Sequence, residues 1–133
     1  MKTTLRAGVA AMAVLFCAHA HAAPVDIKGR WVVDTAPMLA QAKTMKQAEK
    51  WIASIKKTYT GGLMVIDANT MKMSIIGLSG DPVLYQYKIA SAKDNCVSIV
   101  LGPAPQPIRF CISGEVLSII DPTTPLIVTH RRQ

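Results

Sequence analysis

The chain has 133 residues, of which 50% are hydrophobic, and carries 15 lysines and arginines against 8 aspartates and glutamates. The positive charge is dispersed, because adjacent basic residues occur only at Lys56-Lys57 and Arg131-Arg132. A nucleic-acid-binding protein usually combines a basic stripe with aromatic platforms. The composition therefore argues against nucleic acid as a partner.

The N-terminal segment has the pattern of a secretory signal peptide. Lys2 and Arg6 form a short basic region, and residues 7–18 form an apolar core of the usual length. Ala20-His21-Ala22 then supplies small residues at the spacing that a signal peptidase requires. The apolar run is too short to span a bilayer, which takes about 20 residues. We predict that residues 1–22 are a signal peptide.

This assignment also fixes the expected location and domain content. Cys17 follows Phe16, whereas a bacterial lipid-attachment signal has a small residue there, so Cys17 is interpreted as part of the signal. Removal of the signal leaves about 110 residues, the size of one compact domain. We therefore expect residues 23–133 to form a single domain in the periplasm or outside the cell.

The first two predicted elements of that domain are a strand and one long helix. Residues 27–34 alternate in polarity, which is typical of a strand, and residues 35–59 have helical periodicity. Thr35 is the expected N-cap, Pro37 suits the first turn, and Gly61-Gly62 ends the helix.

The predicted helix is amphipathic. Its apolar side carries Met38, Leu39, Ala42, Met45, Ala48, Trp51, Ile52, Ile55 and Tyr59. Lysines lie on the opposite side, at Lys43, Lys50 and Lys57. Two interpretations remain open: the lysines are the solvated face of a helix packed on a sheet, or they contact an anionic membrane surface. We favour the first, because charged outer faces are the ordinary case.

The rest of the chain consists of short strands separated by turns. The predicted strands are residues 63–66, 71–78, 83–89, 96–101, 108–113, 116–120 and 126–131. Together with residues 27–34 they make seven or eight strands in an antiparallel up-and-down meander. We expect a mainly β protein, a closed or nearly closed barrel, with the amphipathic helix between strands 1 and 2.

Cys96 and Cys111 are the two cysteines that remain after the signal. The midpoint between them falls at Pro103-Ala104, so a hairpin centred there places the cysteines directly opposite each other. The same register pairs Val97 with Phe110 and Ile99 with Ile108 on the other face. We predict a structural disulfide on the outer face. The sequence has no C-x-x-C motif, and we expect no metal and no cofactor.

Catalytic patterns are not evident in the sequence. His130 is the single histidine after residue 22, and a lone histidine near a terminus is usually a surface residue. The carboxylates sit mostly at strand ends and turns, as turn chemistry predicts. No G-x-S-x-G, H-E-x-x-H, phosphate-binding loop or dinucleotide motif occurs. We therefore expect a binding protein rather than an enzyme.

Methionine and aromatic side chains are the candidates for lining a ligand site, because they suit an adaptable apolar pocket. The candidate ligand-binding residues are Trp31, Trp51, Met64, Met73, Tyr85 and Tyr87. The same residues also suit a filled core, which is the more usual outcome in a domain of this size. An eight-stranded barrel has an interior that side chains just fill, or one that holds a small ligand.

Gly29-Arg30-Trp31 resembles the G-x-W opening of the lipocalin and calycin group. In that group an arginine near the end of the last strand lies against the tryptophan, and Arg131 or Arg132 matches it. A helix between the first and second strands is similar to the intracellular fatty-acid-binding branch. The resemblance implies a carrier of a small hydrophobic molecule. The chain departs from the group in being shorter and in lacking both a helix after the last strand and an Arg-x-Tyr carboxylate clamp.

Two other partners remain alternatives. A small periplasmic inhibitor or immunity-type protein would bind another protein through an exposed loop, for which residues 102–107 are suited because three prolines stiffen them. That function predicts a filled core. Contact with a membrane surface would require the apolar side of the helix to be free rather than packed.

Overall fold

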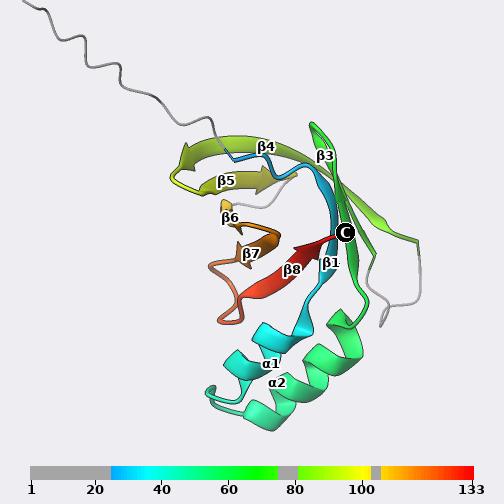
Figure 1. The fold of residues 1–133 in the computed structure, drawn as a ribbon, viewed down its shortest axis with the longest axis vertical. Helices are drawn as coiled ribbons and strands as arrows, with labels where there is room; N and C mark the ends of the chain where they lie inside the picture. Colours follow the sequence, from blue (N-terminus) through cyan, green and yellow to red (C-terminus); the bar gives the residue numbers. More distant parts are fainter. Residues whose placement is uncertain (1–24, 75–80, 103–105) are drawn as a thin grey trace, which may run out of the picture.

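The computed structural model describes residues 25–74, 81–102 and 106–133. Within these ranges eight strands form a closed barrel in which each strand pairs antiparallel with the next and β8 pairs with β1 (Figure 1). The strands are β1 Gly29–Val33, β2 Leu63–Ile66, β3 Thr70–Ser74, β4 Val83–Lys93, β5 Cys96–Leu101, β6 Ile108–Ser113, β7 Val116–Ile120 and β8 Val128–Arg132. The predicted mainly β meander is confirmed. The predicted signal peptide and the end of the predicted strand 71–78 lie outside the described residues.

Strand β4 is longer than the sequence pattern indicated. The prediction ended it at Ile89, but pairing with β5 continues to Lys93, which lies opposite Cys96. The register shifts between Ile89 and Ser91. A bulge of this kind changes which residues face inward, and so it interrupts the alternation by which a strand is recognised.

The single predicted helix is in fact two. Helix α1 spans Thr35–Ala42, and α2 spans Ala48–Ser54 and continues as a π-helical turn, η1, over Ile55–Tyr59. Gln47 between them adopts a left-handed conformation, with φ of 59°. The N-cap of α1 is Asp34, not Thr35, because the Asp34 carboxylate accepts a hydrogen bond from the backbone N–H of Ala36.

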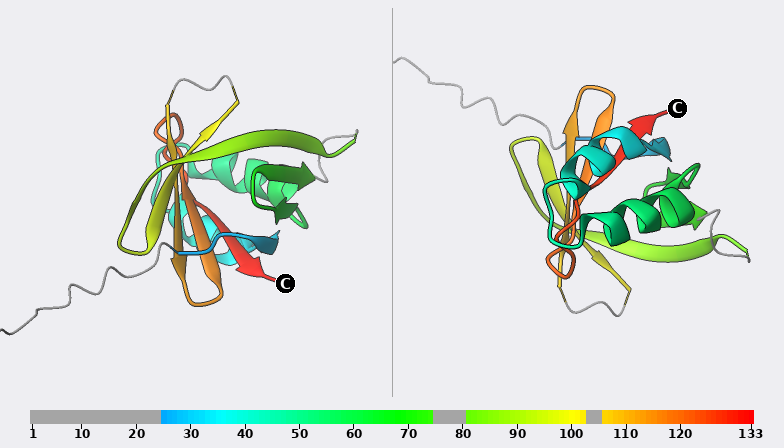
Figure 2. Two further views of the ribbon diagram at one scale, coloured as in Figure 1. Left: turned by 90° about the horizontal axis from the view of Figure 1, so that it is seen from above. Right: turned by 90° about the horizontal axis from the view of Figure 1, so that it is seen from below.

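The break shortens the helical segment to fit one end of the barrel. A continuous helix over residues 35–59 would be about 37 Å long at 1.5 Å per residue. Divided in two, the segment folds back on itself, and both helices lie across the same end of the barrel (Figures 1 and 2). No helix in the described ranges has the length and apolar character needed to cross a membrane.

Two apolar clusters hold these parts together. The larger one fills much of the barrel and consists of Ile27, Trp31, Met64, Ile66, Met71, Tyr87, Val97, Ile99, Leu101, Phe110 and Leu117. The second joins the helices to the barrel end through buried Met38, Ala42, Ile55 and Leu126. The apolar side of the helices is therefore packed.

The β5–β6 hairpin has the predicted register. Cys96 lies opposite Cys111, and the Cα atoms of this disulfide are 4.0 Å apart. Val97 pairs with Phe110 and Ile99 with Ile108. Val97, Ile99 and Phe110 are buried, whereas both cysteines are only half-buried. The disulfide closes a sequence separation of 15 residues, and a loop of that size contributes about 3 kcal/mol by constraining the unfolded chain.

Candidate functional site

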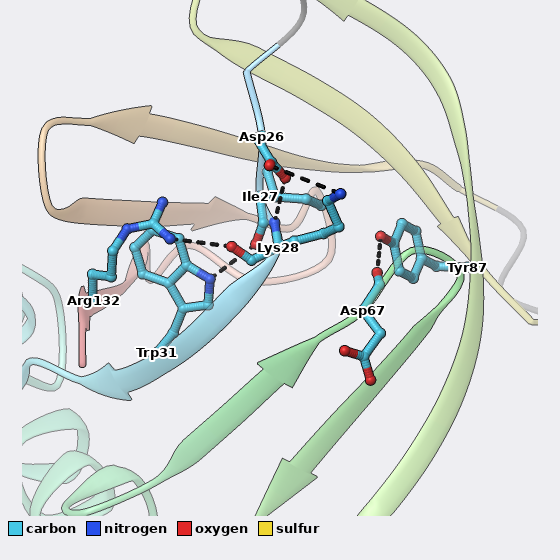
Figure 3. Close-up of polar contacts among 7 residues, drawn as sticks. All are labelled: Asp26, Ile27, Lys28, Trp31, Asp67, Tyr87 and Arg132. Carbon is cyan, nitrogen blue, oxygen red and sulfur yellow. Dashed lines mark hydrogen bonds and ion pairs between the residues drawn. The ribbon is translucent and has the colours of Figure 1, made fainter.

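One half of the barrel interior is closed around Trp31. The indole has no exposed surface, and its Nε1–H donates a hydrogen bond of 2.9 Å to the carbonyl of Ile27. The guanidinium of Arg132 lies 4.3 Å from the centre of the indole ring and donates to the carbonyl of Lys28 at 3.1 Å (Figure 3). The first described residues thus cross the end of the barrel that lies away from the helices (Figure 1).

Gly29 makes this arrangement possible. Its φ is +140°, a value that side-chain-bearing residues rarely adopt. A Cβ at this position would stand 2.8 Å from Nη1 of Arg132. The glycine of the G-x-W motif therefore lets the arginine reach over the tryptophan. The structure assigns to Arg132 the position that the sequence left open between Arg131 and Arg132.

The hydroxyl group of Tyr87 also has a hydrogen-bond partner in this half. Tyr87 is buried, and its hydroxyl donates to the backbone carbonyl of Asp67 (Figure 3). Burial raises the pKa of the Tyr87 hydroxyl, and the negative charges of Asp26 and Asp67 raise it further. The Trp31 half therefore combines filled space with paired polar atoms.

The other half, beside the helices, is hollow. A cavity of about 540 Å³ lies there. Ligand pockets typically measure about 300–1,000 Å³ and are mostly apolar with a few polar groups. The lining residues include Val33, Met64, Met73, Tyr85, Ile119 and His130. These six come from the six strands β1, β2, β3, β4, β7 and β8, and Thr58 and Tyr59 of the π-helical turn also line the cavity.

Three of the six predicted ligand-binding residues line this cavity. They are Met64, Met73 and Tyr85; Met64 and Met73 are cross-strand neighbours on β2 and β3. Trp31 and Tyr87 belong instead to the filled half, where their polar atoms are already paired. Trp51 packs with the helices. The residues predicted as one group are thus divided among three environments.

His130 lines the cavity, although the sequence pattern was interpreted as placing it on the surface. It is 6% exposed, and its Nδ1 is buried with no hydrogen-bond partner among the described residues. Burial lowers the pKa of His130 to about 4, so the ring is neutral at pH 7. The sequence signal for this position is alternation, because Val128 and His130 are two residues apart on β8 and both face the cavity. Proximity to the terminus led to the opposite interpretation.

Charged groups are scarce around the cavity. Among the described lining residues there is no lysine or arginine, and the one acidic residue is Asp121. One carboxylate oxygen of Asp121 accepts hydrogen bonds from the backbone N–H and the hydroxyl of Thr123, at 2.8 and 2.7 Å. Within the described ranges, no three histidine, cysteine or acidic side chains gather in a way that would hold a metal ion.

The fold and the cavity define a closed eight-stranded antiparallel barrel with one filled and one hollow half. No protein-family model, curated protein or solved structure matches the chain.

Proposed function

We propose that the protein is a non-enzymatic binding protein that carries a small hydrophobic molecule in the hollow half of its barrel. The observation that carries this proposal is the cavity of about 540 Å³, walled by apolar side chains such as Met64, Met73 and Ile119. Burial of a ligand's apolar surface there would contribute about 25 cal/mol per Å². Methionines on two adjacent strands make that wall adaptable to ligand shape.

We further propose that the chain is a lipocalin-like, calycin-type protein that works in the periplasm or outside the cell. The contact between Arg132 and Trp31, with Gly29 beneath it, supports the first part of this proposal. The signal-like residues 1–22 and the Cys96–Cys111 disulfide support the second, because disulfides persist in oxidising compartments.

The two alternative partners have less support. An inhibitor or immunity-type protein was expected to have a filled core, and the hollow half does not favour it. Association with a membrane surface was expected to need a free apolar helix side, but Met38, Ala42 and Ile55 on that side are buried.

Blocking the cavity provides the test. We expect Ile119→Trp, which places a larger side chain in the cavity wall, to abolish binding of the neutral apolar dye Nile red to the purified protein. Leu84→Trp is the matched control, because Leu84 is 61% exposed and does not line the cavity. It should bind as the wild type does. Wild-type protein that binds no Nile red, or equal binding by both variants, would contradict a ligand site in the barrel.

Native mass spectrometry of the protein, purified gently from its own compartment, would identify the natural ligand. A retained mass that is lost on denaturation is the expected result. Its absence from Ile119→Trp and its presence on Leu84→Trp would locate it in the cavity.

A further inference from the structure

The imidazole of His130 is a polar group in an apolar wall. On β8, His130 lies opposite Leu117 of β7 and Val33 of β1, both apolar. Two residues further along the same ladder, Arg132 lies opposite Trp31. His130 therefore stands one layer from the filled half, at the inner part of the cavity.

One nitrogen of this ring has no hydrogen-bond partner in the described part of the chain. Buried polar atoms in native proteins nearly always have a hydrogen-bond partner, so an unpaired one requires an explanation. The Nδ1 atom of His130 has none. Trp31 and Tyr87, the other buried side chains with polar atoms inside the barrel, both donate to backbone carbonyls. The unpaired ring thus coincides with the space in which a ligand would lie.

The charge of the wall limits the ligand further. An ionised carboxylate that leaves water needs a cation or several donors to replace its hydration. No lysine or arginine lines the cavity among the described residues, and Asp121 would repel an anion. The neutral His130 ring supplies no positive charge. The cavity is therefore suited to an uncharged molecule.

The tautomer of His130 indicates which polar group fits. A histidine is usually held in one tautomer by a partner on one ring nitrogen, but Nδ1 of His130 has no such partner. The ring can therefore offer either a donor or an acceptor, and a half-turn about Cβ–Cγ exchanges each ring nitrogen with a ring carbon with little change of shape. A hydroxyl group both donates and accepts, so it matches the ring in either state.

We propose that the ligand is an uncharged lipophilic alcohol whose hydroxyl group hydrogen-bonds the imidazole of His130 while its apolar body fills the cavity. This inference rests on the carrier function proposed above and specifies the ligand class for the same site. His130 determines specificity, and the apolar wall provides most of the affinity.

The test compares decan-1-ol with Nile red on the full chain. His130→Leu removes both ring nitrogens and keeps an apolar side chain in the wall. We expect it to bind decan-1-ol about two- to twelvefold more weakly, the range of one net hydrogen bond, and Nile red with nearly unchanged affinity. Gln86→Leu is the matched control, because it replaces an exposed polar side chain that does not line the cavity by the same leucine. We expect both probes to bind it as they bind the wild type.

Nuclear magnetic resonance of the wild type gives a readout that does not depend on how a variant folds. Addition of decan-1-ol should shift the ring ¹⁵N signals of His130, which is the single histidine after residue 22. Decanoate at neutral pH should bind more weakly than decan-1-ol. Decanoate binding as tight as the alcohol, or unshifted His130 signals at saturation, would overturn the proposal.

The failure of this inference is distinguishable from the failure of the carrier function. If neither Nile red nor decan-1-ol binds the wild type, the carrier function itself is wrong, and this inference with it. If both probes bind but decan-1-ol neither shifts His130 nor loses affinity in His130→Leu, only the assignment of the alcohol to His130 is wrong.

Discussion

The two halves of the barrel are built from the same eight strands. They differ in how completely the interior is filled and its polar atoms are hydrogen-bonded. In the Trp31 half the interior is filled and the indole, Tyr87 and Arg132 all have hydrogen-bond partners. In the His130 half there is a cavity, and a buried ring nitrogen has no hydrogen-bond partner among the described residues. A fully satisfied interior stabilises a fold, whereas unfilled space and an unpaired polar group reduce stability and leave room for a ligand.

The difference originates at the ends of the barrel. At one end the residues before β1 cross the opening and supply Ile27 to the core and its carbonyl to the indole. At the other end the helices pack through their own cluster, which includes Met38 and Leu126. Since the helices use their apolar side on one another and on the barrel rim, they leave the interior beneath them unfilled.

Replacement of a large aromatic residue in each half should give the largest difference between the two halves in the free energy of unfolding. We expect Trp31→Ala to lower the free energy of unfolding by about 3–5 kcal/mol, because it empties a filled site and removes the indole hydrogen bond. Tyr85→Ala, in the wall of the existing cavity, should cost no more than about 1–2 kcal/mol. Chemical denaturation measures both. Equal losses would show that the two halves contribute alike to stability.

The pH dependence of stability should depend on the hollow half, because His130 lies there. The pKa of His130 is lowered by burial to about 4 in the folded protein, against 6.5 in an unfolded chain. Between these values the unfolded state binds a proton that the folded state does not, so stability falls as the pH falls. The loss from pH 6.5 to pH 4 should be about 3 kcal/mol, from 1.36 kcal/mol per pKa unit.

His130→Leu provides the comparison for this effect. The difference between wild type and variant cancels the contribution of every titratable group that the two proteins share, and leaves the contribution of His130. We expect the two stability curves to run parallel above pH 6.5 and to diverge below it. Curves that stay parallel down to pH 4 would mean that His130 titrates normally and is not held neutral by burial.

Much of the fold follows from patterns that are local in the sequence. The register of the β5–β6 hairpin was predictable because Cys96 and Cys111 are symmetric about a turn and the apolar residues alternate with them. The break in the helical segment was not, because Gln47 adopts a left-handed conformation without the glycine that normally signals one. The extension of β4 was hidden by the register shift after Ile89.

The site was less predictable because it depends on contacts between distant parts of the chain. Alternation indicated that Met64, Met73 and Tyr85 face inward, and they do line the cavity. Nothing local told them apart from Trp31, which is covered by residues before β1 and by Arg132, about a hundred residues later in the chain. Sequence patterns can thus predict which residues face the interior of a barrel, but they do not predict which part of the interior remains empty.

The smallest effect should come from the contact that closes the filled half. Arg132→Lys keeps the charge but loses the planar group stacked over Trp31, and we expect a loss of about 1 kcal/mol. Arg131→Lys is the matched control: Arg131 pairs with Asp34 at 2.7 Å, but its side chain is 64% exposed, and exposed ion pairs contribute about 0–1 kcal/mol. Hydrogen exchange of the Trp31 indole N–H should accelerate in the first variant and not in the second. If both variants behave alike, the two terminal arginines act only as surface charges, and the filled half is closed by the Ile27 contact alone.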